Sequence, residues 1–340
     1  MTHKIEPVRV ALIGAGAISS AYSLALEAMD QMNLVGVADV NPQAASDLAE
    51  KHNCASFECF EKMCDETKPE AVIVCTPPAT HREIAVSLMD RSIHVLCEKP
   101  LATTPEDAWT MIRAAQSNEV IFTMASKFRF VPDVAKTREL LSEGILGDII
   151  LFENSFTGVV DMSTRWNSDP ALSGGGVLID NGTHSVDIMR FLLGPLSEIR
   201  AVEGKRLQSM NVEDTVHIFV KSVEGVVGSI DLSWSLSKGL PNFINIFGSN
   251  GTLHVGWRES KYKLNGDDDW TVFGTGYDKV AAFRNQLVNF AGAIRGIEPL
   301  VIGPADAIAS VYTIEAAYQA MDSNDWLPVT LSDKIYEETK

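Results

Sequence analysis

The first forty residues contain the pattern that most limits what this chain can fold into. An apolar, β-branched run at 8–13 is followed by a glycine turn beginning at Gly14 and by helical spacing over 17–29. A second apolar run, 33–38, ends at Asp39. Strand, glycine turn, helix, strand and acid form the first half of a dinucleotide-binding unit. This order predicts a Rossmann-type fold in the N-terminal part of the chain.

The residues of this unit match its physical demands. Gly14 permits the tight turn, and Gly16 lets the backbone approach a pyrophosphate held at the helix N-terminus. Ser19 replaces the third glycine and is small enough for close helix packing. Asp39 stands where an acid binds the ribose 2′-hydroxyl and repels a 2′-phosphate, which favours NAD over NADP. The alternative is a structural glycine turn followed by an aspartate that caps a helix.

Alternation of helices and strands continues to about residue 126. Apolar runs predict further strands at 71–75, 94–97 and 120–125. Helical spacing predicts helices at 43–52, 60–66, 80–91 and 105–117. This α/β alternation predicts a doubly wound parallel sheet, and we place the first domain at residues 1–126.

The second part of the chain has a different character. Strand-like segments separated by turn pairs dominate, at 149–156, 199–207, 215–221, 226–236, 243–247 and 252–255. Helices are expected at 134–141, 279–295 and 306–321. We therefore expect residues 127–340 to form an α+β domain with a large, open and mostly antiparallel sheet. Such a sheet needs a cover on its second face, which favours a homodimer or homotetramer.

Composition excludes several classes of partner. The formal net charge of −17 argues against a nucleic acid or an anionic membrane, because both need a basic surface. The chain has no uncharged apolar run of about 18 residues, and its first residues lack a signal-peptide core, so a cytoplasmic location is expected. Cys54, Cys59 and Cys64 form no CxxC pair, so we expect no metal site.

An ionisable pair follows the strand expected at 94–97. Glu98, Lys99 and Pro100 stand at its carboxyl end, where ligands bind in open α/β sheets. A surface ion pair that closes the strand is the alternative, and such pairs contribute little.

A second group of polar residues follows three glycines at 174–176, which are expected to give a flexible backbone that can approach a ligand closely. A helix is expected to run on to Leu193, with Asp180 and His184 four residues apart on one face. Asp187 lies one turn beyond, where it could orient the imidazole. This arrangement is typical of a general acid/base pair. The alternative is an ordinary helix-start acid with an exposed or core histidine.

Four local patterns together resemble the glucose–fructose oxidoreductase/inositol dehydrogenase (Gfo/Idh/MocA) family. They are GAGAIS with Asp39, TPPATH at 76–81, EKP at 98–100 and GGGVLIDNGTH at 174–184. The resemblance implies a catalytic trio of Lys99, Asp180 and His184, and a cis bond before Pro100. The cofactor-contact positions that it implies are Gly14, Gly16, Ala17, Ile18, Asp39, Thr76, Pro77, His81 and Glu98. For His81, exposure to solvent is the alternative.

The resemblance also implies an activity. It is NAD-dependent oxidation of a secondary alcohol on a small-molecule substrate: a sugar, a cyclitol such as inositol, or a sugar derivative. In addition to the trio, Arg129 is expected to contact the substrate or the nicotinamide. Arg165 and Trp166 are expected to contact the substrate, because a sugar suits an aromatic face and a bidentate donor. For Trp166, a position in the core is the alternative. Either Lys99 or His184 is the proton acceptor. The alternatives are an NAD-retaining glycosidase of the same fold and a non-catalytic regulator that senses NAD.

Overall fold

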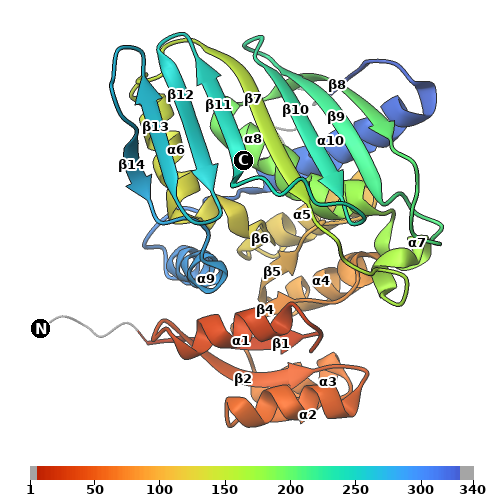
Figure 1. Cartoon of the computed structure of the whole chain (residues 1–340). Coiled ribbons are helices and arrows are strands. Elements are labelled where there is room, and N and C mark those ends of the chain that lie inside the picture. The colour runs from red at the N-terminus through yellow and green to blue at the C-terminus, as the bar shows by residue number, and fades with distance from the viewer. Residues whose placement is uncertain (1–5, 330–340) are drawn as a thin grey trace, which may run out of the picture. The chain divides into compact units, whose positions relative to one another are not determined.

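The computed structural model describes residues 6–329, which form two units, each built on its own β-sheet (Figure 1). Of the described residues, the first unit contains 6–102, Glu106–Lys127 and Lys279–Ala307. The second unit contains Thr103–Pro105, Phe128–Asp278 and 308–329. The domain boundary between residues 126 and 127 stays a prediction. The structure adds that a later segment, 279–307, belongs to the first unit.

The first unit is a doubly wound parallel sheet, as the sequence predicts. Its six strands lie in the order β3-β2-β1-β4-β5-β6, and every neighbouring pair is parallel. The strands are β1 (Val8–Ile13), β2 (Met32–Ala38), β3 (Ala55–Phe57), β4 (Ala71–Val74), β5 (His94–Glu98) and β6 (Phe122–Ala125). The order reverses between β1 and β4, so the carboxyl ends of these strands form the switch point at which such sheets bind ligands.

Helices surround this sheet and close its core. They are α1 (Ser19–Glu27), α2 (Pro42–Lys51), α3 (Phe60–Thr67), α4 (His81–Met89), α5 (Pro105–Ser117) and α9 (Lys279–Ile294), with the short helix η1 (Pro78–Thr80). Helix α9 packs against α1 and places Phe283, Leu287 and Phe290 in the same apolar cluster as Val8 and Leu12 of β1. A helix from the last fifth of the chain thus completes the core of the first unit.

The second unit is built on a nine-stranded sheet in the order β14-β13-β12-β11-β7-β10-β9-β8-β15. Its strands are β7 (Ile149–Thr157), β8 (Leu196–Glu203), β9 (Thr215–Ser222), β10 (Val227–Ser233), β11 (Asn242–Gly248), β12 (Gly251–Gly256), β13 (Ser260–Leu264), β14 (Thr271–Gly274) and β15 (Leu327–Pro328). Strands β7 and β10 are parallel and the other neighbours are antiparallel. The expectation of a mostly antiparallel sheet is confirmed.

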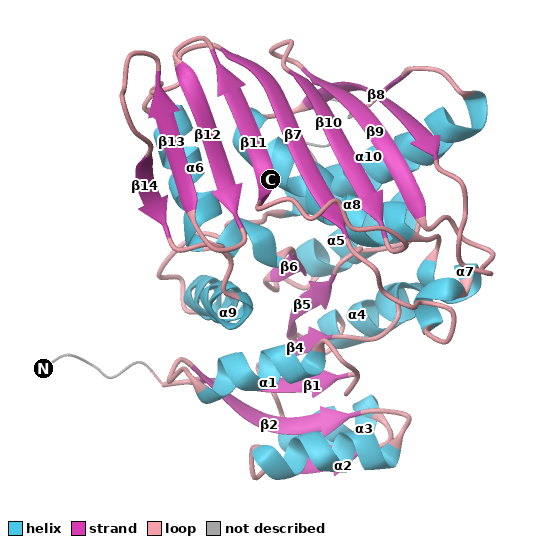
Figure 2. Ribbon diagram, viewed as in Figure 1, coloured by secondary structure: helices cyan, strands magenta, loops and turns pink. Residues whose placement is uncertain are grey.

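Three helices of this unit lie on one face of its sheet: α6 (Pro132–Ser142), α8 (Val177–Leu193) and α10 (Pro304–Ser323) (Figure 2). The unit also contains the short helices η2 (Lys127–Phe130), η3 (Trp166–Ser168) and α7 (Pro170–Ser173). Helix α8 packs on β7, β9 and β10, and α6 packs on β12. Because α8 lies over the central strands, its inward side chains are held by the core of the unit.

Two expected strands end earlier than the sequence suggests, and four short strands were not expected. Strand β8 ends at Glu203 and β10 ends at Ser233, whereas the strands expected at 199–207 and 226–236 extend to Leu207 and Leu236. Gly204 approaches Thr215 so closely that an added Cβ would lie 2.9 Å from its methyl group, and there the chain leaves the sheet. Strands β3, β13, β14 and β15 are too short or too polar to carry a clear alternation.

Candidate active site

The glycine turn after β1 has the form that a dinucleotide requires. Gly14 has φ +91°, and a Cβ there would lie 2.8 Å from the carbonyl oxygen of Cys75. Gly16 is exposed, and an added Cβ would meet nothing within 4 Å. The hydroxyl of Ser19 donates to the Gly14 carbonyl at 2.5 Å and closes the turn. Gly14 is therefore packed against Cys75 and held by Ser19, whereas Gly16 leaves the backbone accessible to a pyrophosphate.

Asp39 ends β2 beside this turn. Its carboxylate accepts hydrogen bonds from the backbone N–H groups of Ala15 at 2.6 Å and Asn41 at 2.7 Å. The carboxylate is half-buried and lies next to the glycine turn. Among the other expected cofactor positions, Ala17 is exposed and Ile18 is half-buried at the start of α1. These residues fit a bound NAD.

His81 is fully buried at the start of α4, which rules out the solvated alternative. Its Nε2 lies 2.9 Å from the Thr76 carbonyl, and its Nδ1 lies 3.1 Å from the Pro100 carbonyl and 3.2 Å from that of Leu101. Burial lowers the pKa of His81, although the three carbonyls favour its charged form. The imidazole thus ties the Thr76–Pro77 turn to the turn that follows Lys99.

The Glu98-Lys99 pair stands at the carboxyl end of β5, and the bond between Lys99 and Pro100 is cis, as the family resemblance implies. Glu98 is buried, and its Oε1 accepts a hydrogen bond from the Tyr22 hydroxyl at 2.7 Å. Gln286 of α9 donates to the same hydroxyl at 3.1 Å. Burial raises the pKa of Glu98, although the charge of Lys99 opposes the rise. A buried carboxylate is thus fixed directly beside the half-buried lysine.

In the second unit, α8 carries Asp180 in its first turn and His184 one turn later. His184 is buried, and its ring lies 5.0 Å from that of Phe128 in an edge-to-face arrangement and 6.4 Å from that of Phe156. Asp180 is half-buried. The imidazole therefore sits against an aromatic wall, beside a more accessible carboxylate on the same helical face. The sequence does not reveal this wall, because its members come from η2 and β7.

Asp187 forms a buried ion pair with Arg129 that the sequence does not predict. Its carboxylate accepts hydrogen bonds from Nε of Arg129 at 2.9 and 3.0 Å and from the terminal Nη2 at 2.6 Å. Both side chains are buried, and the guanidinium also lies 5.0 Å from the ring centre of Phe191. Arg129 thus binds the carboxylate of Asp187, and the orienting of His184 by Asp187 stays a prediction. A substrate contact of Arg129 stays a prediction, and here its guanidinium joins η2 to α8.

The other expected substrate residues lie on the segment between β7 and α7, residues 158–169, which we name the β7–α7 segment. Arg165 is exposed, and Trp166 is 41% exposed in η3. Trp166 is therefore not a core residue, and its ring is accessible to a ligand. Lys99 belongs to the first unit and Asp180 and His184 to the second, so their joint action stays a prediction.

The three glycines before α8 also differ from the expectation of a flexible approach to a ligand. A Cβ on Gly174 would lie 2.6 Å from the Thr103 methyl group, and one on Gly175 would lie 2.0 Å from the Tyr318 hydroxyl. On Gly176 it would lie 2.0 Å from the Glu213 carbonyl oxygen. These glycines are needed because other parts of the protein pack directly against the backbone.

Within residues 6–329, no group of three or more His, Cys, Asp or Glu side chains is arranged to hold a metal ion. Over the same residues, no helix has the length and apolarity needed to cross a membrane.

Comparison with known sequences finds family models that match segments of both units. Residues 8–126 match the Gfo/Idh/MocA sequence model described as "Oxidoreductase family, NAD-binding Rossmann fold", and residues 134–254 match the model of the GFO/IDH/MocA C-terminal domain. D-glucoside 3-dehydrogenase of Escherichia coli (strain K12) is 30% identical over 266 residues, covering 76% of this chain and 72% of the relative. The rhizopine catabolism protein MocA of Rhizobium meliloti is 28% identical over 334 residues, covering 92% and 95%.

Solved structures show the same fold. The structure of levoglucosan dehydrogenase in complex with NADH superposes with a TM-score of 0.88 at 23% sequence identity, covering 96% of this chain and 100% of that one. At this identity the likeness concerns the fold alone. It confirms a Rossmann unit followed by a large mixed-sheet unit.

Proposed function

Because the chain belongs to the Gfo/Idh/MocA family of oxidoreductases, we propose that it oxidises a secondary alcohol on a sugar, a cyclitol or a sugar derivative. The observation that supports this most directly is α8, which presents Asp180 and buried His184 on one helical face. Family members whose names record polyhydroxy substrates, D-glucoside 3-dehydrogenase and myo-inositol 2-dehydrogenase among them, support the substrate class.

The glycine turn, Asp39 and the Thr76–Pro77 turn would hold the dinucleotide, which when bound supplies the acceptor for the hydride. Asp39 supports NAD over NADP, because its carboxylate would repel a 2′-phosphate. In this proposal Lys99 stabilises the negative charge that develops on the substrate oxygen. His184 or Lys99 takes the hydroxyl proton, and Asp180 orients the reacting groups.

We also propose that the protein is a homodimer or homotetramer in which a second copy covers the face of the nine-stranded sheet opposite α8. Three apolar side chains support this arrangement: Val202 of β8, Phe219 of β9 and Val227 of β10 are each exposed. The strand registers place all three on that same face.

The proposed reaction is tested by incubating the protein with NAD or NADP and a panel of inositols, free sugars and glycosides, with NADH absorbance as the readout. We expect NADH to form with at least one polyol and the rate with NAD to exceed that with NADP. Cleavage of a glycoside without net NADH would instead identify an NAD-retaining glycosidase. If NAD binds but no member of the panel reacts, the oxidoreductase proposal is contradicted for these substrate classes.

A further inference from the structure

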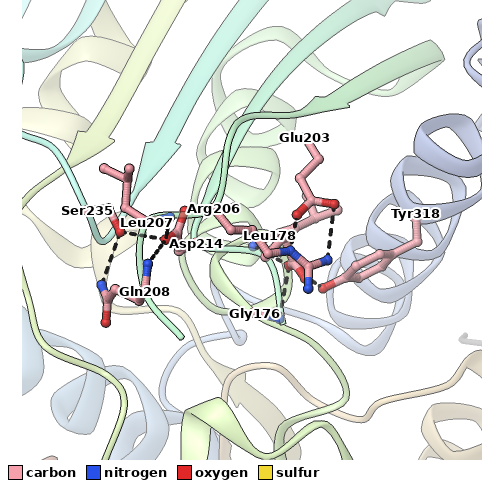
Figure 3. Close-up of polar contacts among 10 residues, drawn as sticks. Gly176, Leu178, Glu203, Arg206, Leu207, Gln208, Asp214, Ser235 and Tyr318 are labelled. Carbon is pink, nitrogen blue, oxygen red and sulfur yellow. Dashed lines mark hydrogen bonds and ion pairs between the residues drawn. The ribbon is translucent and has the colours of Figure 1, made fainter. Parts of the chain in front are cut away.

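Two adjacent carboxylates, Glu213 and Asp214, lead into β9, and both are buried. They bind different parts of the second unit, and Figure 3 shows many of these contacts. Neither residue belongs to a motif that the sequence reveals. Because an unpaired buried charge is costly, each carboxylate must be stabilised by the groups that surround it.

Glu213 caps α8 from outside the helix. Its Oε1 accepts hydrogen bonds from the N–H groups of Gly176 at 2.9 Å and Leu178 at 3.0 Å, and its own backbone carbonyl accepts the N–H of Val177 at 2.9 Å. The N-cap residue of α8 is Gly176, which has no side chain to do this. One residue thus binds three consecutive N–H groups that a helix start leaves without intrahelical partners.

Tyr318 of α10 completes this cap. Its hydroxyl donates to the same Oε1 at 2.7 Å (Figure 3). The glycines at 175 and 176 leave room for Tyr318 and Glu213, since a Cβ at either position would lie 2.0 Å from one of them. The first turn of α8, which carries Asp180, is therefore located by Glu213.

Asp214 holds the loop between β8 and β9 in a similar way. Its Oδ2 accepts hydrogen bonds from the N–H groups of Leu207 at 2.8 Å and Gln208 at 2.9 Å, and from the Ser235 hydroxyl at 2.7 Å. Figure 3 shows Gln208, Asp214 and Ser235 gathered in this network. The carboxylate fixes the backbone of Gln208 and so determines where its side chain reaches.

The side chain of Gln208 binds the β7–α7 segment. Its Oε1 accepts the N–H of Met162 at 2.9 Å, and its Nε2 donates to the Val160 carbonyl at 3.0 Å. The amide thus uses both a donor and an acceptor on one short stretch of backbone, as a neighbouring strand would. Arg165 and Trp166 follow three and four residues after Met162 on this segment.

We propose that Gln208 and Glu213 are positioning residues: Gln208 places the β7–α7 segment that contacts the substrate, and Glu213 places the helix that carries Asp180 and His184. Asp214 holds the backbone of Gln208, and the adjacent residue Glu213 holds the start of α8. The β7–α7 segment and α8 are therefore both anchored at the beginning of β9. This proposal rests on the proposed function for the roles of Arg165, Trp166 and α8. It predicts that Gln208 controls substrate binding and that Glu213 controls turnover.

The kinetic test compares Gln208→Ala with the parent enzyme on the best substrate of the panel. We expect the KM for substrate to rise about tenfold or more, because a small misplacement of a binding segment has large effects, while kcat and the KM for NAD change little. Leu207→Ala is the matched control, since this side chain is 64% exposed and only its backbone N–H binds Asp214. An unchanged KM in Gln208→Ala would overturn the role of Gln208.

Glu213 is tested by two variants that differ in one property. Glu213→Ala removes the acceptor for Gly176 and Leu178, and we expect kcat to fall about tenfold or more. Glu213→Gln keeps an amide oxygen as acceptor and is expected to restore most of kcat. Equal loss in both variants would contradict the capping role. If Glu213→Ala does not fold, parent-like kcat in the Gln variant supports the role and a tenfold loss contradicts it.

A second readout does not depend on activity. Hydrogen exchange of backbone N–H groups should become faster around Met162 in Gln208→Ala and around Gly176 and Leu178 in Glu213→Ala, with no change in Leu207→Ala. Unchanged exchange would overturn the proposal even in an active enzyme. A parent enzyme that turns over nothing but shows these exchange differences would contradict the proposed function while retaining the two anchoring roles.

Discussion

At the scale of single residues, Lys99 is the position on which the proposed chemistry depends most. It follows β5 at the switch-point edge of the parallel sheet, with buried Glu98 on one side and Pro100 on the other. His81 binds the Pro100 and Leu101 carbonyls and so fixes the turn that follows Lys99. The backbone around Lys99 is therefore fixed at the carboxyl end of β5.

Replacing Lys99 with Met keeps a long apolar stem and removes the charge. We expect kcat to fall at least about a hundredfold, because both the electrostatic and the proton-transfer contributions would be lost. NAD affinity, measured by titration of protein fluorescence, should stay within a few-fold of the parent. Lys51→Met, an exposed lysine at the end of α2, is the control. Turnover close to that of the parent would remove Lys99 from the mechanism.

Glu98 makes stability depend on pH. Burial raises its pKa above the ordinary 4.5, so the folded protein holds this proton at pH values where the unfolded chain has lost it. The contribution of Glu98 is therefore fully present at low pH and is lost as pH rises through its folded-state pKa. We expect the free energy of unfolding of the parent, relative to Glu98→Gln, to decrease as pH rises above 4.5. Urea denaturation of both proteins across this range measures it, and a difference independent of pH would contradict the shift.

At the scale of elements, η2 and α8 are joined by the buried pair of Arg129 and Asp187. Removing the carboxylate would leave a buried guanidinium without its main counter-charge. We expect Asp187→Ala to lower the free energy of unfolding by about 3–5 kcal/mol. The double variant Arg129→Met/Asp187→Leu should recover much of this loss, because both charges are then absent. A loss below about 1 kcal/mol in the single variant would show that the pair contributes no more than a surface pair.

Most elements of both units could be predicted from the sequence, because their apolar periodicity is local. The expected strand at 94–97 and helix at 105–117 correspond to β5 and α5 within one residue. The partners that complete the site could not be predicted in the same way. Glu213 lies 37 residues from Gly176, and Arg129 lies 58 residues from Asp187. Such contacts depend on which elements pack together, and no local pattern records that.

The same distinction explains the motif residues. Gly14, Asp39 and Lys99 could be identified because the spacing between each of them and a strand end has a chemical meaning. The glycines before α8 could be identified as unusual, but the reason for them could not. Their neighbours Thr103 and Tyr318 come from parts of the chain far from the glycines. A glycine run alone does not tell close packing from flexibility.

At the scale of the whole molecule, the chain returns to its first unit after finishing most of the second. Helix α9 contributes Gln286 to the hydroxyl of Tyr22, which binds Glu98. Arg295, just after this helix, pairs with Glu70 before β4. The periodicity of α9 predicts an apolar face but not the unit that covers it. The first unit is therefore complete only when segments from both ends of the described chain are present.

The open face of the nine-stranded sheet gives the last prediction. In strand β9, Val216, Ile218 and Val220 are buried on the side of α8, so Phe219 points to the opposite face, where it is 39% exposed. If a second copy covers this face, the particle mass must exceed the 37.0 kDa of one chain. Burial of apolar area at such an interface would be opposed by a charge at its centre.

We therefore expect sedimentation at micromolar concentration to show dimers or tetramers for the parent, and smaller particles or a weaker association for Phe219→Asp. Ile297→Asp replaces an exposed apolar residue in the first unit and should leave the mass unchanged. A parent protein that sediments only as single chains would contradict a homo-oligomer. An oligomer that Phe219→Asp leaves intact would place the interface on a different surface, because a buried carboxylate without a partner is costly enough to weaken any interface that contains it.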